Sequence, residues 1–131
     1  MTDPQISRLD RVLAALALAT GVAHLLLALA YHLRFGQFLP LLWGQLLAAG
    51  LLIAAGAAAF DRRPARPWLC GAFGFAFAVH WNTFFQAAEV GLEGAHAPAL
   101  VAVLRASGAA LVVTGVGFVA ALVATRPSRS A

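Results

Sequence analysis

Hydrophobic residues run along this chain in four long stretches separated by short polar segments. The stretches extend from about residue 12 to 33, 38 to 60, 68 to 88 and 99 to 125. Each reaches the roughly 20 residues that an α-helix needs to cross the ~30 Å hydrocarbon core of a bilayer. The strands of a membrane β-barrel are about half as long and alternate in polarity. The pattern therefore predicts one all-α domain over residues 1–131, an integral membrane four-helix bundle.

Turn signals separate the four stretches. Gly36 lies in the first connection, a charged loop with two prolines over residues 61–67 is the second, and Gly94 lies in the third. Proline is favoured in the first turn of a helix, so we expect Pro98 to open the last one. Small residues also recur four apart, which favours packing within the bundle over a dimer interface. They are Gly50, Ala54 and Ala58 in one stretch, and Ala106, Ala110 and Thr114 in another.

Composition supports a bilayer as the solvent of this chain. Of the 131 residues, 62% are hydrophobic and only 11% are charged, whereas soluble domains carry about 25% charged residues. The net charge of +4 does not indicate nucleic-acid binding, because the basic residues cluster at the ends of apolar stretches and form no basic face. The single cysteine, Cys70, excludes an internal disulfide, and we interpret it as a packing residue.

Arginine placement predicts the orientation in the membrane. Seven of the nine basic residues fall on one side of the expected topology: Arg8, Arg11, Arg62, Arg63, Arg66, Arg126 and Arg129. By the positive-inside rule this side is cytoplasmic, so both termini are expected in the cytoplasm and the protein in a bacterial inner membrane. Ala28-Leu29-Ala30 also fits a signal-peptidase site, and cleavage after Ala30 would leave three helices. The length of the first stretch and the interruption by His24 argue against cleavage.

Polar side chains gather in the predicted outer half of the membrane. Such residues are candidate functional groups because burying them in lipid is costly. We expect a ligand pocket open to the exterior and formed by His24, Tyr31, Gln45, His80, Asn82, Thr83, Gln86 and Arg105. His24 and His80 lie at similar depths, within about 5 Å of the bilayer centre.

Three interpretations of His24 and His80 remain open from the residues alone. Each histidine can hydrogen-bond to a neighbouring helix and fix the packing. The pair can also be the axial ligands of one b-type haem. In the third interpretation, the histidines and Arg105 bind a small lipophilic ligand or a quinone. A second haem is disfavoured, because His32 and His96 do not form a second pair.

Arg105 has two interpretations of its own. It can extend to the outer headgroups, or it can form an ion pair with Glu89 or Glu93 across the third connection. The second is favoured because these groups lie at similar heights. The sequence contains no zinc-ligand spacing, phosphate-binding loop or catalytic constellation, so no metal site is expected and an accessory role is favoured over an enzymatic one.

The layout resembles the DoxX-like group of small bacterial membrane proteins. The resemblance covers most of the chain and rests on four helices, a short charged loop after the second, and the step Gly21-Val22-Ala23-His24-Leu25. Some members are linked to quinone-dependent oxidation, which implies a quinone pocket here. The primary hypothesis is an accessory membrane protein, with a membrane-protein partner or a second copy, or one that binds a lipophilic ligand. The alternative is a redox component that uses quinone or haem b at His24 and His80.

Overall fold

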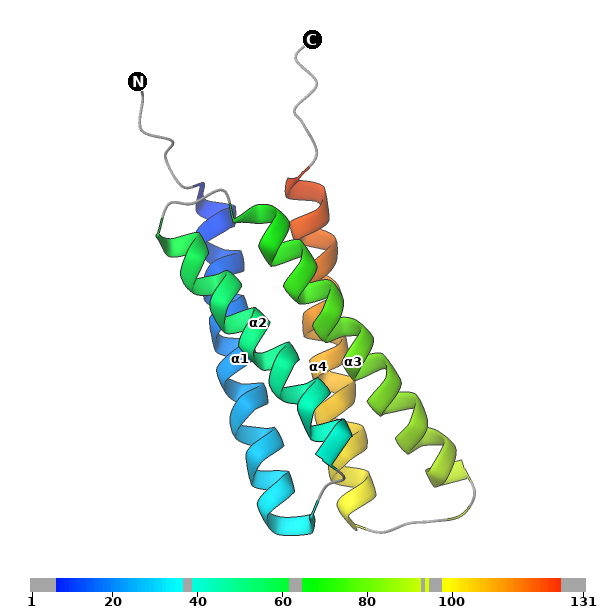
Figure 1. Cartoon of the computed structure of the whole chain (residues 1–131). Helices are drawn as coiled ribbons and strands as arrows, with labels where there is room; N and C mark the ends of the chain where they lie inside the picture. Colours follow the sequence, from blue (N-terminus) through cyan, green and yellow to red (C-terminus); the bar gives the residue numbers. More distant parts are fainter. Residues whose placement is uncertain (1–6, 37–38, 62–64, 93, 95–97, 126–131) are drawn as a thin grey trace, which may run out of the picture.

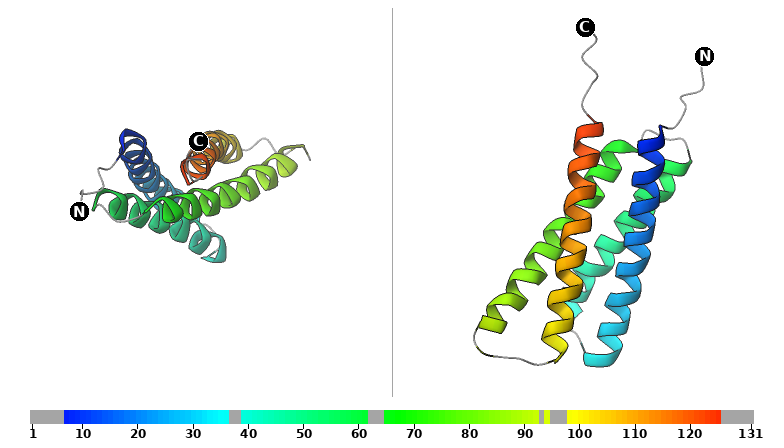
Figure 2. Two further views of the ribbon diagram at one scale, coloured as in Figure 1. Left: turned by 90° about the horizontal axis from the view of Figure 1, so that it is seen from above. Right: turned by 180° about the vertical axis from the view of Figure 1, so that it is seen from behind.

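Four α-helices account for nearly all of the residues that the computed structural model describes, which are 7–36, 39–61, 65–92, 94 and 98–125. The helices are α1 (Arg8–Phe35), α2 (Leu39–Phe60), α3 (Arg66–Leu92) and α4 (Pro98–Ala124), and no β-strand occurs in these ranges. Successive helices run antiparallel, so that α1 begins and α4 ends at the same end of the molecule (Figures 1 and 2). The four predicted helices are confirmed, with bounds that differ by a few residues.

Local signals set the helix ends. Ser7 caps α1: its hydroxyl accepts from the amide of Asp10, and its own amide donates to the Asp10 carboxylate, which completes a capping box. This cap explains why α1 starts four residues before the apolar stretch. Gly36 ends α1 with a φ of 67° and donates its amide to the His32 carbonyl, a conformation that glycine adopts without strain. Pro98 opens α4, as predicted.

Three of the four helices are long and apolar enough to cross a membrane, within the part of the chain that the structure describes. They are α1, residues Leu42–Phe60 of α2, and α4. α3 has 27 residues and is therefore long enough, but His80, Asn82 and Gln86 lower its hydropathy. Four of the eight residues of the predicted site thus lie in α3, the one helix outside this set of three.

Glycine brings α1 and α2 into close contact. A Cβ atom on Gly21 of α1 would lie 2.8 Å from the Ile53 side chain and 3.0 Å from the Ala49 carbonyl oxygen. A Cβ atom on Gly56 of α2 would lie 2.9 Å from the Ala14 carbonyl oxygen of α1. Backbones this close exclude any side chain at the crossing, as in membrane helix pairs joined through small residues.

α3 and α4 form a second pair, which packs phenylalanine rings against glycines. Gly117 of α4 faces the ring of Phe73, at a distance of 2.5 Å from the position of its missing Cβ atom. The same packing recurs along the pair, between Phe77 and Gly115, Phe84 and Gly108, and Phe118 and Gly74. Phe73 is fully buried. α3 and α4 are therefore held together by phenylalanine rings that pack directly against the glycine backbone of the facing helix.

The densest core lies toward the end where the termini emerge. Its members come from all four helices and are mostly small: Leu13, Ala14, Ala17, Ala48, Leu52, Ala55, Ala59, Ala65, Leu69, Ala72, Phe73, Ala76 and Ala121. Cys70 packs against this cluster, which confirms its interpretation as a packing residue. The predicted small-residue ridge of α2 packs only in part: Gly50 and Ala54 are exposed, whereas Ala58 packs against the core cluster. The ridge of α4 likewise runs from the exposed Ala106 to the fully buried Thr114.

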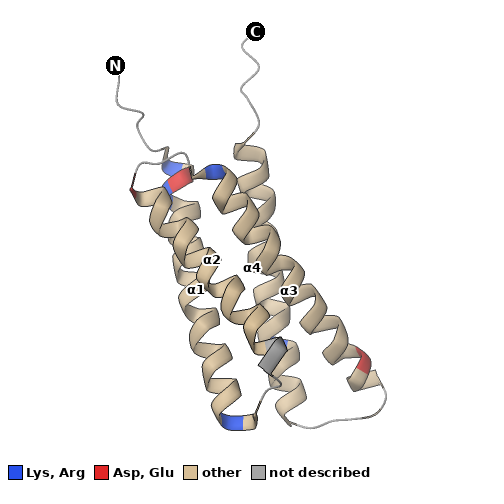
Figure 3. Cartoon of the chain, viewed as in Figure 1, with Lys and Arg blue, Asp and Glu red and all other residues tan. Residues whose placement is uncertain are grey.

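Charged residues lie toward the two ends of the helical assembly (Figure 3). The terminal end holds Arg8, Asp10, Arg11, Asp61 and Arg66, whereas Arg34, Glu89 and Arg105 lie toward the other end. Arg62, Arg63, Arg126 and Arg129, on which the predicted orientation also depends, lie outside the described residues. The long middle part of each helix is therefore free of charge, as a hydrocarbon environment requires.

Candidate functional site

His24 of α1 and His80 of α3 meet between the two helix pairs. Their ring centroids are 4.5 Å apart and the rings are nearly perpendicular, at 79°. His24 lies one turn after Gly21, and the close α1–α2 crossing at that glycine fixes its position. His80 shares the inward face of α3 with Phe73 and has only 3% of its surface exposed. The sequence predicted the matching depths of the two histidines, and the structure brings their rings into contact.

Both imidazoles keep one ring nitrogen without a protein partner. Among the described residues, neither Nε2 of His24 nor Nε2 of His80 has a hydrogen-bond partner, although both atoms are buried. His24 also has a hydrogen bond with the backbone of Gln45 on α2. A buried polar group without a partner costs about 1–3 kcal/mol. The histidine pair is therefore a site that a ligand carbonyl or hydroxyl group would stabilise.

The other predicted pocket residues do not join the histidines, with the exception of Gln45. Gln86 and Asn82 are exposed on α3, where the Gln86 amide donates to the Asn82 side-chain oxygen at 3.2 Å. The Thr83 hydroxyl donates to the carbonyl of Val79, one turn earlier in its own helix. Tyr31 packs against Phe35, and Arg105 is exposed. The structure thus brings only the backbone of Gln45 to the histidines, while the remaining predicted residues are exposed or half-buried elsewhere on their helices.

A haem does not fit between the histidines in this arrangement. An iron atom held between two Nε2 atoms, at about 2 Å from each, would place the ring centroids roughly 6 Å apart. The observed centroids are 4.5 Å apart and the rings touch edge to face, which leaves no room for a porphyrin plane. A quinone needs only a hydrogen-bond donor beside an apolar surface. The donor set therefore suits a quinone better than a haem.

Within the described part of the chain, the histidine pair does not belong to a larger group of metal-binding side chains. Across the described ranges, no group of three or more histidine, cysteine or carboxylate side chains is placed to hold a metal ion. Structural and catalytic metal sites usually have three or four protein ligands. Hydrogen bonding is therefore the chemistry that the pair offers most directly.

The predicted ion pair of Arg105 stays a prediction. Within the described residues Arg105 forms no ion pair with Glu89, and both side chains are exposed. Glu93, the other predicted partner, lies outside the described residues. Exposure of Arg105 is compatible with the alternative interpretation, in which its head group extends to the membrane surface.

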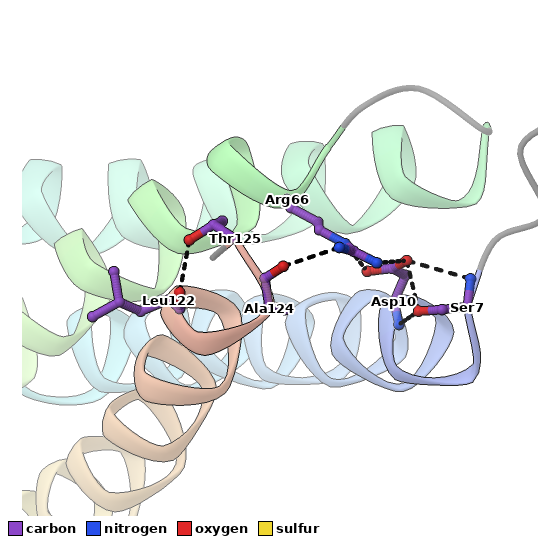
Figure 4. A network of polar contacts seen from close by, with 6 residues as sticks. All are labelled: Ser7, Asp10, Arg66, Leu122, Ala124 and Thr125. Atoms are coloured by element: carbon purple, nitrogen blue, oxygen red, sulfur yellow. Dashed lines mark hydrogen bonds and ion pairs between the residues drawn. The ribbon is translucent and has the colours of Figure 1, made fainter. Parts of the chain in front are cut away.

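A second polar cluster, which was not predicted from the sequence, lies at the terminal end (Figure 4). The Arg66 guanidinium donates to both carboxylate oxygens of Asp10, at 2.7 and 2.9 Å, and to the Ala124 carbonyl at 2.9 Å. It thereby joins the start of α1, the start of α3 and the end of α4. The hydrogen bond from Arg66 lowers the pKa of Asp10, which precedes the apolar part of α1. The Ser7-x-x-Asp10 spacing was the available signal, because a capping box fixes a carboxylate at a helix start.

Comparisons with known proteins identify no relative of this chain. No protein-family model matches the sequence, and neither a curated protein nor a solved structure matches it.

Proposed function

We propose that the chain is a four-helix bundle of the bacterial inner membrane that binds a quinone-like lipophilic ligand at His24 and His80. The observation that carries the proposal is the contact between the half-buried His24 imidazole and the buried His80 imidazole on a different helix; in each ring, the buried Nε2 atom has no hydrogen-bond partner among the described residues. A neutral imidazole donates through one nitrogen and accepts through the other. The bond that His24 donates to the Gln45 backbone leaves its Nε2 atom as an acceptor. A ligand hydroxyl group can therefore donate to His24, and His80 can donate to a ligand carbonyl oxygen.

The topology of the helices supports a crossing by α3 as well. α2 ends at the terminal end of the molecule and α4 begins at the opposite end (Figure 1). If α2 and α4 cross a bilayer, α3 must return the chain across it. At 1.5 Å per residue, its 27 residues extend about 40 Å, more than the ~30 Å hydrocarbon core.

The proposed orientation of the chain in the membrane follows from the distribution of its arginine residues. Arg8, Arg11 and Arg66 lie at the terminal end, and the remaining arginines of the predicted cytoplasmic set lie in the adjacent loop and tail of the sequence. The positive-inside rule then places both termini in the cytoplasm. A green fluorescent protein fused to the C-terminus should fluoresce in intact bacteria, whereas alkaline phosphatase fused there should be inactive. The reverse pattern would overturn this orientation.

The ligand-binding proposal is tested by thermal unfolding of the purified protein in mild detergent, with and without decylubiquinone. A ligand that binds only the folded protein raises its Tm. We expect this rise in the wild type and its loss in His24→Phe and His80→Phe, which keep a ring but remove the nitrogens. His32→Phe is the matched control, because His32 also has a buried ring nitrogen without a partner but lies outside the pair.

The same variants separate ligand binding from packing. Phenylalanine keeps the ring packing but removes the hydrogen bond of His24 to the Gln45 backbone. The ligand-free His80→Phe protein should therefore be as stable as the wild type or more stable, whereas His24→Phe should lose about 1 kcal/mol of the free energy of unfolding. An equal ligand-induced rise of Tm in all four proteins would contradict the proposal. A Soret band in the wild-type preparation that disappears in both variants would replace the quinone with a haem.

A further inference from the structure

One face of α3 points away from the other three helices and carries a regular pattern. Exposed residues recur there at alternating spacings of three and four, opposite the buried face that holds Phe73 and His80. We call this set the outer face of α3: Gly71, Phe75, Ala78, Asn82, Phe85 and Glu89. A 3.5-residue repeat sustained over a helix is the pattern by which two helices pack along their length.

Asn82 lies in the middle of this face, and its hydrogen-bonding capacity is only partly used. Its side-chain oxygen accepts from the Gln86 amide at 3.2 Å. Among the described residues, the Asn82 amide group, with two donors, and the Gln86 side-chain oxygen, an acceptor, have no other partner. In a helix that crosses a bilayer, these groups would face lipid, which offers no partner for them.

The pattern around Asn82 permits a close approach of another helix. Nothing lies within 4 Å of the position that a Cβ atom on Gly71 would take. Ala78, one turn before Asn82, is small and exposed. Small residues on one side of a polar residue let two membrane helices come near enough for the side-chain amides to hydrogen-bond.

We propose that the outer face of α3 binds the same face of a second copy of this chain. The proposal rests on the membrane crossing of α3 proposed above. Two copies inserted with the same orientation are related by a two-fold axis along the membrane normal, so each Asn82 lies at the depth of its counterpart. The Asn82 amide of one copy can then donate to the Gln86 oxygen of the other, and the reverse contact follows by symmetry.

A second copy suits this face because the available groups are complementary to themselves. After the bond between them, the Asn82 amide remains as a donor and the Gln86 oxygen as an acceptor. In a two-fold contact, each of these groups in one copy pairs with the complementary group of the other copy. A single asparagine within such a repeat also favours a defined register and a dimer. The two Glu89 side chains approach each other near the end of the helix, three residues before Leu92, where water screens their repulsion.

Cysteine cross-linking of the full chain in liposomes tests the proposal, starting from a Cys70→Ser background. We expect Ala78→Cys to form a covalent dimer on mild oxidation. Ala54→Cys is the matched control, because Ala54 is also exposed but lies on α2. A dimer formed equally well by both, or only by Ala54→Cys, would overturn the proposal.

A second measurement concerns the role of Asn82 and does not depend on cysteine. We expect Asn82→Leu, which keeps α3 apolar and helical, to weaken dimerisation in liposomes by about tenfold, measured by energy transfer between labelled copies at increasing dilution. Ala54→Leu should leave it unchanged. A monomeric wild type, an unchanged Asn82→Leu dimer, or cross-linking of Ala78→Cys only to a different protein in native membranes would refute the proposal.

Two further measurements distinguish the dimer from the proposed membrane crossing of α3 and from the proposed ligand site. Labelling of Ala78→Cys in intact cells by a membrane-impermeant maleimide would show that α3 does not cross the bilayer. Loss of the decylubiquinone effect in the histidine variants, with the cross-link intact, would concern the ligand site alone.

Discussion

Replacing Gly21 by alanine tests the close crossing of α1 and α2, on which the position of His24 depends. The new Cβ atom would lie 2.8 Å from Cγ1 of Ile53, 3.0 Å from the Ala49 carbonyl oxygen and 3.0 Å from the Ile53 amide nitrogen. Carbon atoms pack best at about 3.5–4.0 Å. The Ile53 side chain can rotate, but the other two atoms belong to the backbone of α2. The two helices must therefore separate by several tenths of an ångström.

The size of the effect follows from two opposing contributions. Overpacking of a tight core costs about 1–3 kcal/mol. Alanine is favoured over glycine within a helix by about 0.5–1 kcal/mol. We expect Gly21→Ala to lower the free energy of unfolding by about 1 kcal/mol.

Gly50→Ala is the matched control, because nothing lies within 4 Å of its added Cβ atom. It should raise the free energy of unfolding by about 0.5–1 kcal/mol. The helix preference for alanine is the same in both variants. The difference between their free energies of unfolding is therefore the cost of the clash at Gly21, about 1–3 kcal/mol. At this chain length, that corresponds to a difference in Tm of roughly 3–10 °C.

The assay is thermal unfolding in mild detergent, followed by far-ultraviolet circular dichroism, with both variants measured in the same preparation. Helix content should be the same before unfolding, since both positions stay helical. Equal stabilisation by Gly21→Ala and Gly50→Ala would refute the close α1–α2 crossing, because the added Cβ atom would then meet no neighbour at either position.

The cluster at the terminal end gives two further predictions. Arg66→Ala should lower the free energy of unfolding by about 1 kcal/mol, since the Arg66 side chain is 45% exposed and solvent weakens such pairs; Arg8→Ala, at an exposed position of α1, should change it little. Arg66 lowers the pKa of Asp10 below its ordinary value near 3.8, so the stabilisation is complete above about pH 4 and is lost as the pH falls through the lowered pKa. In a Tm series from pH 6 to pH 3, wild type should therefore lose more stability than Asp10→Asn, and parallel curves would contradict the role of this carboxylate.

The helices of this fold were predictable because their signals are local. Runs of apolar residues, Gly36 and Pro98 mark the ends within a few positions. The start of α1 was placed too late, because Ser7 and Asp10 extend the helix through a capping box of polar residues. Hydropathy does not detect such a signal, whereas the spacing of the two residues does.

The candidate site was predictable only in part. The depth of a residue in a membrane follows from its position along one helix, whereas the direction of its side chain depends on how that helix packs against the others. Counting residues along each helix placed His24 and His80 at matching depths, and the structure brings them together. Asn82 and Gln86 lie at suitable depths too, but the rotation of α3 turns them outward. That rotation depends on which glycines receive the rings of Phe73 and Phe84, and a single sequence does not specify this pairing.

The arrangement of the helices as two tight pairs has a mechanical consequence for the histidines. α1 and α2 are locked through Gly21 and Gly56, and α3 and α4 through rings on glycine, whereas α1 and α3 touch only over a short stretch. The core cluster near the terminal end joins the two pairs, and α2 also packs against α3. His24 and His80 belong to different pairs, so a tilt of one pair against the other about that core would separate the two rings. A ligand could then enter between the two rings while the close contacts within each helix pair stay intact.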